Sequence, residues 1–385
     1  MGKCGVYLTM YVEWANKLFI MRFTYISGKR RIFEKLRREG RISRAELARK
    51  CSLTRPAVSA IIEELIADGF VRELGPGRST GGKPPIMLEF IPGARCAVGI
   101  NLGGDGLIEG VLCNLACEVL KSEAVTYEND FDNIFKGCER LIRLLSSRLS
   151  GRNLSGVGIA VSGVVDNSGT VVQSTLDIVG KPLAELLERK TGVPVRIERR
   201  PNAAAVAEAL FGAGRDADKL VYLTSGIGVG AGLVIKCENF TGSNGFAGEV
   251  GRLRLPDSRI LEEAARPSVM LKEYNRLTGK NVDMDTFIRT FLSGDETAQN
   301  LVTENAHYLA YAASVAANLF DPDTLVLGGD VLEFGERHFE IFKTEFQSMS
   351  VAAGLGKNPA LLRSLFGRQG VAVGGAQIIL DSLVQ

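Results

Sequence analysis

The chain has few of the residues that build metal sites and disulfide frameworks. Its 385 residues include 7 cysteines, an odd number, and only 2 histidines. No two cysteines form a Cys-x-x-Cys pair, so a zinc site drawing on cysteine and histidine has few possible ligands. We therefore expect buried, free thiols in a protein of the reducing cytoplasm, and no bound metal.

Long apolar runs are also missing. The stretch Val6–Ile20 is interrupted by Glu13, Asn16 and Lys17, and it is too short and too polar to span a bilayer. It lacks the charged start, apolar run and small-residue cleavage site of a signal peptide. We interpret residues 1–21 as an extension of doubtful status and expect no membrane partner.

Charge is unevenly distributed along an otherwise ordinary composition. Hydrophobic residues make up 45% and charged residues 23%, as in globular proteins of two or three domains. Residues 1–90 hold 17 basic and 9 acidic residues, a net charge of +8, and the remainder has a net charge of −6. A basic module on an acidic body indicates a polyanionic partner, although charge alone does not separate nucleic acid from a membrane surface.

The pattern after residue 22 predicts two short helices followed by a longer one. Ile32, Phe33 and Leu36 repeat at helical spacing among basic residues. Ser43–Glu46 has the sequence of a capping box at the start of a second helix. Thr54 is placed to cap a third helix, which would enter the major groove of DNA.

Two strands and a basic loop follow these helices. Phe70–Leu74 and Ile86–Phe90 alternate like strands, and Gly75–Pro85 is rich in glycine and proline. Residues 22–91 therefore resemble a winged helix-turn-helix domain that binds double-stranded DNA. The alternative is a helical protein-interaction module with a solvated basic face, and in that case Arg55 is only a solvated charge at a helix start. The expected DNA contacts lie at two helix starts and in the wing: Ser43, Arg44, Thr54, Arg55, Ser59, Arg78 and Lys83.

From residue 95 the pattern changes to apolar strands separated by helices. Ala97–Leu102 reads as a buried strand with a hairpin partner, and Ala306–Phe320 reads as a long amphipathic helix. The glycine-rich segment Ser225–Gly232 is expected to form one loop before a strand at Leu233–Ile235. Close backbone packing explains such a glycine-rich turn about as often as phosphate binding does. The alternation predicts a two-lobed α/β body with a ligand cleft.

Several motifs in order give the chain from about residue 30 a resemblance to the ROK family, which contains repressors, open reading frames and sugar kinases. The segments that carry it are Ser79–Pro84, Ser162–Asp166, Asn202–Glu208, Gly226–Gly232, Gly245–Gly251, Leu327–Gly329 and Gly374–Gly375. The resemblance implies an actin-like, ribonuclease-H-like sugar-kinase fold. Lobe I would span residues 92–203, with residues 366–385 returning to it, and lobe II would span 204–365. It also implies a homodimer or tetramer.

The departures from the family pattern bear on catalysis. Asn101 and Asp105 stand in the segment where family kinases have Asp-x-Gly-x-Thr to hold metal–nucleotide phosphates. Arg200 stands where those kinases have the aspartate general base, and arginine stays protonated and cannot take a proton. Arg252 replaces a histidine of the zinc motif, and its cysteine segment is absent. The resemblance thus implies degenerate nucleotide loops at Asn101, Gly103, Asp105, Gly226, Gly228, Gly328 and Gly329.

We therefore expect a repressor of sugar-utilisation genes whose kinase-like body senses a carbohydrate-type effector without ATP, magnesium or zinc. The alternatives are an active sugar kinase with a DNA-binding module, and a DNA-binding protein without a ligand. By family position, the expected effector residues are Arg199, Arg200, Glu249, Arg252 and Glu262. Three arginines in one cleft suit an anionic effector such as a sugar phosphate or sugar acid. Alternatively, they pair internally with Glu198, Glu249 and Glu262, and the pocket is closed or takes a neutral polyol.

Overall fold

The computed structural model describes residues 27–77, 84–147, 149, 154–255, 257–351 and 355–384. The chain divides into two compact units, residues 1–92 with 383–385, and residues 93–382. Each unit is described by itself. The expected extension at residues 1–21 and the wing residues Arg78 and Lys83 lie outside the described residues. Within the described residues, no helix is long and apolar enough to cross a membrane.

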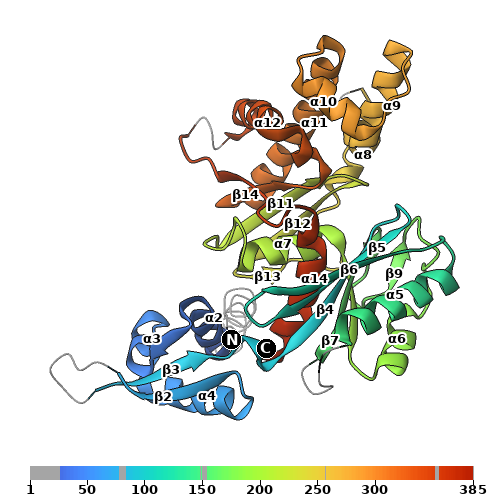
Figure 1. The fold of residues 1–385 in the computed structure, drawn as a ribbon. Coiled ribbons are helices and arrows are strands. Elements are labelled where there is room, and N and C mark those ends of the chain that lie inside the picture. Colours follow the sequence, from blue (N-terminus) through green and yellow to red (C-terminus); the bar gives the residue numbers. More distant parts are fainter. Residues whose placement is uncertain are drawn as a thin grey trace, which may run out of the picture. The chain divides into compact units, whose positions relative to one another are not determined.

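The first unit is a winged helix-turn-helix domain (Figure 1). Its elements are α2 (Gly28–Glu39), β1 (Arg41–Ser43), α3 (Arg44–Lys50), α4 (Arg55–Ala67), β2 (Val71–Pro76) and β3 (Ile86–Phe90). The strands form an antiparallel sheet in the order β1-β3-β2. Phe33 is fully buried, and its ring packs edge-on against those of Phe70 and Phe90 at centroid distances of 5.8 and 5.6 Å.

Local capping explains where these helices begin and end. The backbone N–H of Gly40, at a φ of 69°, caps the end of α2. Ser43 and Glu46 form the expected capping box, and the Thr54 side chain accepts from the backbone N–H of Ala57 at the start of α4. The three helices and the two wing strands are confirmed. The short strand β1 was not expected, because its three residues are too few to show an alternating pattern.

The second unit holds two lobes, each with a five-stranded mixed sheet, and the two sheets have matching topology. The two lobes are seen in Figure 1. Lobe I has the order β10-β7-β4-β5-β6, with the elements β4 (Cys96–Leu102), β5 (Leu107–Asn114), β6 (Val119–Thr126), α5 (Phe131–Ser146), β7 (Leu154–Val161), α6 (Leu183–Thr191) and β10 (Val195–Arg199). A small hairpin, β8 (Val164–Val165) and β9 (Val171–Gln173), extends from the end of β7.

Lobe II repeats this plan with the order β13-β12-β11-β14-β15. Its strands are β11 (Lys219–Ser225), β12 (Val229–Ile235), β13 (Glu238–Asn239), β14 (Thr324–Gly328) and β15 (Ala360–Arg363). Its helices are α7 (Arg200–Leu210), α8 (Leu261–Ala265), α9 (Pro267–Thr278), α10 (Met284–Leu292), α11 (Glu296–Phe320) and α12 (Gly335–Met349). The repeated sheet is the two-lobed α/β architecture that the sequence predicts.

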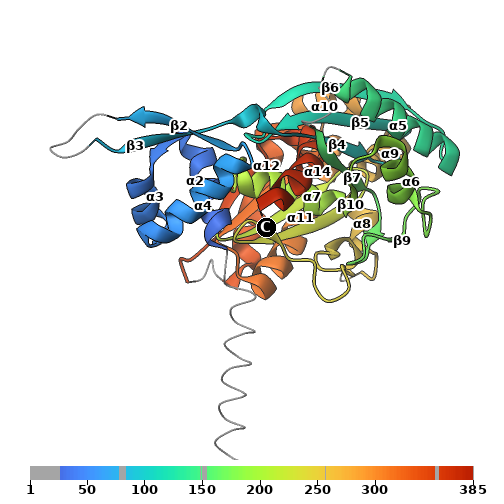
Figure 2. The ribbon, with the colours of Figure 1, turned by 90° about the horizontal axis from the view of Figure 1, so that it is seen from below.

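The last helix, α14 (Gly370–Asp381), packs between the lobes. It lies on β4 and β7 of lobe I and against α7, and both ribbon views show α14 and α7 side by side (Figures 1 and 2). This close approach requires glycine, because a Cβ on Gly158 would overlap the Gly375 carbonyl and one on Gly374 would overlap the Ala203 carbonyl. The late glycine pair Gly374–Gly375 therefore serves helix packing.

The glycine-rich segment 225–232 was wrongly expected to be a single loop. The turn covers only Gly226–Gly228, and β12 begins at Val229. Gly230 and Gly232 lie within this strand, and a Cβ on either would run into Pro201 at the start of α7. Half of the glycine pattern thus reflects strand-to-helix packing, which sequence alone does not separate from a ligand loop.

Candidate functional site

A cavity of about 380 Å³ opens between the two lobes of the body. Lobe I contributes the carboxyl ends of β4 and β7 and the hairpin after β7, and lobe II contributes the Gly226–Gly228 turn and the segment from Glu249 to Arg266. All five expected effector residues line it: Arg199, Arg200, Glu249, Arg252 and Glu262. Of the expected loop residues, Asn101, Asp105, Gly226, Gly228 and Gly329 line it, whereas Gly103 and Gly328 do not.

Arg199, the last residue of β10, serves as an internal anchor. Its side chain is almost fully buried, and one terminal nitrogen lies 2.7 Å from Glu249 Oε1. The other terminal nitrogen donates to the backbone carbonyls of Ala247 and Gly245. Internal pairing, one of the two alternatives considered for the arginines, is therefore correct for Arg199. This residue holds the Gly245–Glu249 segment against the end of β10.

Arg200, the first residue of α7, reaches across to lobe I. Its Nε donates to Asn101 Oδ1 at 2.9 Å, and a terminal nitrogen donates to Ser162 Oγ at 3.3 Å. Asn101 extends this hydrogen-bond network to Glu109, because its Nδ2 donates to Glu109 Oε2 at 2.9 Å. Burial lowers the pKa of Arg200, and the nearby Asp330 carboxylate opposes this shift. The guanidinium nonetheless stays protonated and cannot act as a base.

Glu198, the third carboxylate considered as a partner for the arginines, faces elsewhere. It accepts from the backbone N–H of Arg199 and from the side-chain amides of Asn202 and Asn239. Burial raises the pKa of its carboxyl group above the ordinary value. Glu198 does not line the cavity, and the attraction of the neighbouring Arg199 guanidinium only partly opposes this shift.

The wall of lobe II carries Arg252, Glu262 and a further residue, Arg266, that the sequence reasoning missed. Arg266 follows α8, four residues after Glu262, and this spacing was the available signal. Its Nε is buried and has no hydrogen-bond partner among the described residues. The preceding carbonyl of Ala265 accepts two hydrogen bonds of 2.7 Å, from Ser225 Oγ and Asn305 Nδ2, which fix the end of α8.

The segment between Arg252 and α8, where the family's cysteines would stand, folds back on itself. Arg254 and Ile260 form a β-bridge, and Leu261 N donates to Leu253 O at 2.8 Å. Arg259 forms ion pairs with Asp257 and with Glu304 of α11. Hydrogen bonds and surface ion pairs thus hold this wall of the cavity.

Asp330 and Arg368 also line the cavity, and the sequence reasoning missed both. Arg368 Nε lies 3.0 Å from Asp330 Oδ1, so the two charges neutralise each other. A Cβ on Gly226 would come within 2.8 Å of Asp330, and one on Gly103 within 2.9 Å of Ile227. An apolar side chain therefore packs where the two degenerate loops meet.

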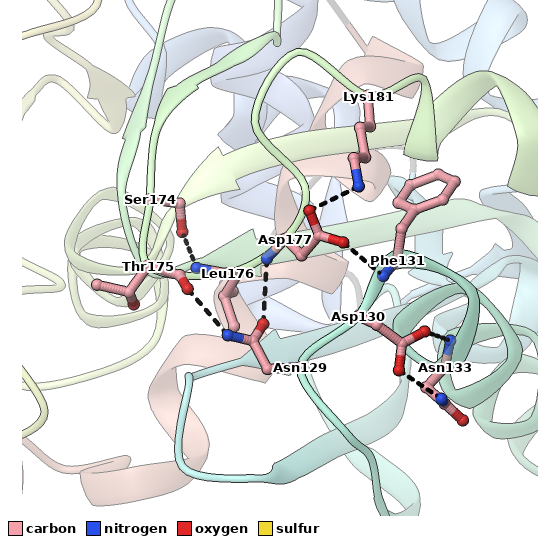
Figure 3. Close-up of polar contacts among 9 residues, drawn as sticks. All are labelled: Asn129, Asp130, Phe131, Asn133, Ser174, Thr175, Leu176, Asp177 and Lys181. Carbon is pink, nitrogen blue, oxygen red and sulfur yellow. Dashed lines mark hydrogen bonds and ion pairs between the residues drawn. The ribbon is translucent and has the colours of Figure 1, made fainter.

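A polar cluster that includes two lining residues holds the rim of the cavity on lobe I (Figure 3). Ser174 and Thr175 line the cavity. Asn129 Nδ2 donates to the Thr175 carbonyl at 3.0 Å, and the backbone N–H of Asp177 donates to Asn129 Oδ1 at 3.1 Å. Asp177 in turn accepts from Lys181 Nζ at 2.6 Å and from the backbone N–H at the start of α5. Asn129 and Asp177 thus fasten this rim to α5.

The expected DNA contacts of the first unit fall into two groups. Ser43 is buried and caps α3, and Arg44 forms an ion pair with Glu73 at 2.7 Å, so both have structural roles. Arg55 is exposed at the start of α4, where it forms no ion pair with a described residue, and Ser59 lies half-buried one turn later. Thr54 is exposed and caps the same helix.

Comparisons with known proteins agree with both units. A model described as the ROK family matches residues 97–382, and one described as winged helix-turn-helix DNA-binding matches residues 29–72. The xylose repressor of Caldicellulosiruptor bescii is 30% identical over 81% of this chain and 85% of its own length. The xylose repressor of Bacillus subtilis is 27% identical over 96% of this chain and 98% of its own.

A curated kinase and the solved structure of a transcriptional regulator are also similar to this chain. A glucokinase of Halalkalibacterium halodurans is 26% identical over 67% of this chain and 87% of its own. The crystal structure of a ROK family transcriptional regulator, a homologue of the Escherichia coli MLC protein, superimposes with a TM-score of 0.77 at 22% identity. The superposition covers 92% of this chain and 96% of the regulator's chain. This similarity shows that the two chains share a fold.

Proposed function

The chain belongs to the ROK family and joins its body to a winged helix-turn-helix domain, and we propose from this premise that it is a transcriptional repressor of sugar-utilisation genes. A carbohydrate-type effector bound in the cavity between the lobes would control its affinity for an operator in double-stranded DNA. The xylose repressors that match most of the chain support the repressor function and a sugar-related effector.

The observation that carries the proposal is the position of Arg200. The resemblance gives this place to the general base of the sugar kinases, and here a guanidinium occupies it, bound to Asn101 and Ser162. Loss of a general base typically costs roughly 10²–10⁴ in rate. We therefore propose that the body is not an enzyme and needs neither ATP with magnesium nor zinc.

A phosphoryl-transfer assay tests this against the kinase alternative. The full chain is incubated with ATP, magnesium and a panel of hexoses, with a known hexokinase as the positive control. The proposal predicts no sugar phosphate above the level without protein. Turnover that disappears in a Glu249→Gln variant would contradict the proposal, because the lobes would then still be catalytic.

We further propose a homodimer or tetramer acting in the cytoplasm, where the chromosome lies. A twofold assembly would present two winged helices to two half-sites one helical turn, or a multiple of a turn, apart. Light scattering of the full chain at micromolar concentration, with and without operator DNA, tests this. A monomer under both conditions would contradict the assembly.

A further inference from the structure

The charges that line the cavity are equal in number but unequal in position. Five arginines and five carboxylates line it: Arg199, Arg200, Arg252, Arg266, Arg368, Asp105, Glu109, Glu249, Glu262 and Asp330. Two arginines are neutralised by direct ion pairs, Arg199 with Glu249 and Arg368 with Asp330. The placement of the remaining charges decides what kind of ligand the cavity suits.

At the end where the two degenerate loops meet, carboxylates outnumber arginines. The carboxylates of Asp330, Asp105 and Glu109 all attract the Arg200 guanidinium and thereby stabilise its charge. Arg200 also has hydrogen-bond acceptors in Asn101 and Ser162. This end of the cavity needs no added anion.

The lobe II residues that flank α8 have the reverse balance. Arg252 and Arg266 line the cavity with a single remaining carboxylate, Glu262, and none of the three forms an ion pair or side-chain hydrogen bond with another described residue. Glu262 packs beside Gly228, where a Cβ would come within 2.6 Å of Oε1. The buried Nε of Arg266 is a donor without an acceptor, which is costly unless a ligand supplies one.

We propose that the effector is an anionic carbohydrate whose carboxylate or phosphate group binds between Arg252 and Arg266. This inference rests on the proposed function of the cavity as an effector site. A guanidinium carries five donors and no acceptor, and its planar fork matches the oxygens of a carboxylate or phosphate. A neutral hydroxyl supplies an acceptor for the half-buried Arg266 but no charge to offset its guanidinium, and Arg252, although exposed, lines the same cavity. Glu262, which only accepts when ionised, is then free to hold a hydroxyl of the same ligand.

Calorimetric titration of the full chain with matched sugars tests the inference. The panel pairs glucose with glucuronate and glucose 6-phosphate, galactose with galacturonate, xylose with xylonate, and N-acetylglucosamine with its 6-phosphate. Inorganic phosphate serves as a bare anion. We expect at least one anionic member to bind at least 10-fold more tightly than its neutral parent. Comparing the sugar acids with the sugar phosphates shows whether the site prefers a carboxylate or a phosphate group.

Charge-removing variants locate the binding site. Arg266→Gln and Arg252→Gln should each weaken the anionic ligand at least 10-fold and leave any binding of the neutral parent within 2-fold. Arg254→Gln is the matched control, because Arg254 is exposed in the same segment but does not line the cavity. It should change no affinity by more than 2-fold.

Three results of the binding titrations would overturn the inference. They are tighter binding of a neutral parent than of its anion, unchanged anion binding in both cavity variants, and no binding by any anionic member, inorganic phosphate included. A neutral sugar that releases the chain from DNA would overturn the anionic effector and leave the proposed function standing. Tight anion binding without any effect on DNA binding would contradict the proposed function alone.

Discussion

Arg200 donates its Nε proton to Asn101 Oδ1 at 2.9 Å, and this bond joins two positions at which the chain departs from the kinase pattern. An aspartate in place of Arg200 could not make this contact, because an ionised carboxylate has no proton to donate. The two departures are thus one structural unit that ties α7 of lobe II to the end of β4 in lobe I.

This coupling is measurable by a double-mutant cycle on the free energy of unfolding. Arg200→Ala should cost about 1–3 kcal/mol because it leaves the side-chain oxygen of the buried Asn101 without a donor. The coupling energy with Asn101→Ala should reach about 0.5–1.5 kcal/mol. Arg196→Ala, at an exposed arginine of β10, the strand that precedes α7, is the control and should stay within about 0.5 kcal/mol. Additive losses at positions 200 and 101 would contradict the coupling.

Arg55 is expected to read a base from the start of α4. Arg55→Ala should weaken binding to the operator by about 1–3 kcal/mol and relax specificity at one base pair, measured by anisotropy on single-substitution operators. Lys29→Ala is the control, since Lys29 is already paired with Glu64 and Asp68. Full operator affinity in Arg55→Ala would favour the alternative of a solvated charge at a helix start.

Lys83 belongs to the wing segment outside the described residues and is expected to grip the DNA backbone. Lys83→Ala should weaken all DNA sequences alike and reduce the slope of log affinity against log salt by about 1. A loss confined to the operator, with the salt slope unchanged, would assign Lys83 to base reading instead.

We expect the buried His338 to make the second unit less stable at acid pH. Asn305 Nδ2 donates to the Ala265 carbonyl, so its Oδ1 accepts from His338 Nε2 at 3.0 Å. Burial lowers the pKa of His338 to about 4 from 6.5. Between these values the unfolded state binds a proton that the folded state excludes, so stability should fall by roughly 3 kcal/mol as pH drops from 6.5 to 4.

Urea unfolding at several pH values checks this. His338→Gln keeps a donor but does not titrate, so its stability should fall less steeply over the same range. His307→Gln, which alters an exposed histidine beside Glu345, is the control and should keep the wild-type slope. Equal slopes in wild type and His338→Gln would show that His338 does not cause the acid sensitivity.

Most of the fold was predictable, because it depends on local signals. The capping box at Ser43, the cap at Thr54 and the alternating strands each act within a few residues of the chain. The segment 225–232 was wrongly expected to be one loop, because the reason for two of its glycines is Pro201, more than twenty residues earlier in the chain.

Only the cavity residues that belong to family motifs could be predicted from the sequence. The motifs correctly predicted that all five expected effector residues line one cavity. They did not show which of the arginines is neutralised by an ion pair within the protein. Arg266 was missed because it follows a short helix without a motif of its own, and Arg368 because its partner Asp330 is 38 residues away in the chain. Ion pairing between distant segments is decided by tertiary structure.

The most direct test of the account is whether a ligand in the cavity changes DNA binding by the full chain. DNA selected from a random pool by the chain should converge on one site with twofold symmetry. Anisotropy on that site should show an affinity change of at least 10-fold with a carbohydrate that binds the cavity, and no change in a Glu249→Gln, Glu262→Gln double variant. Failure to select any site, or an affinity that no cavity-binding carbohydrate alters, would contradict the account.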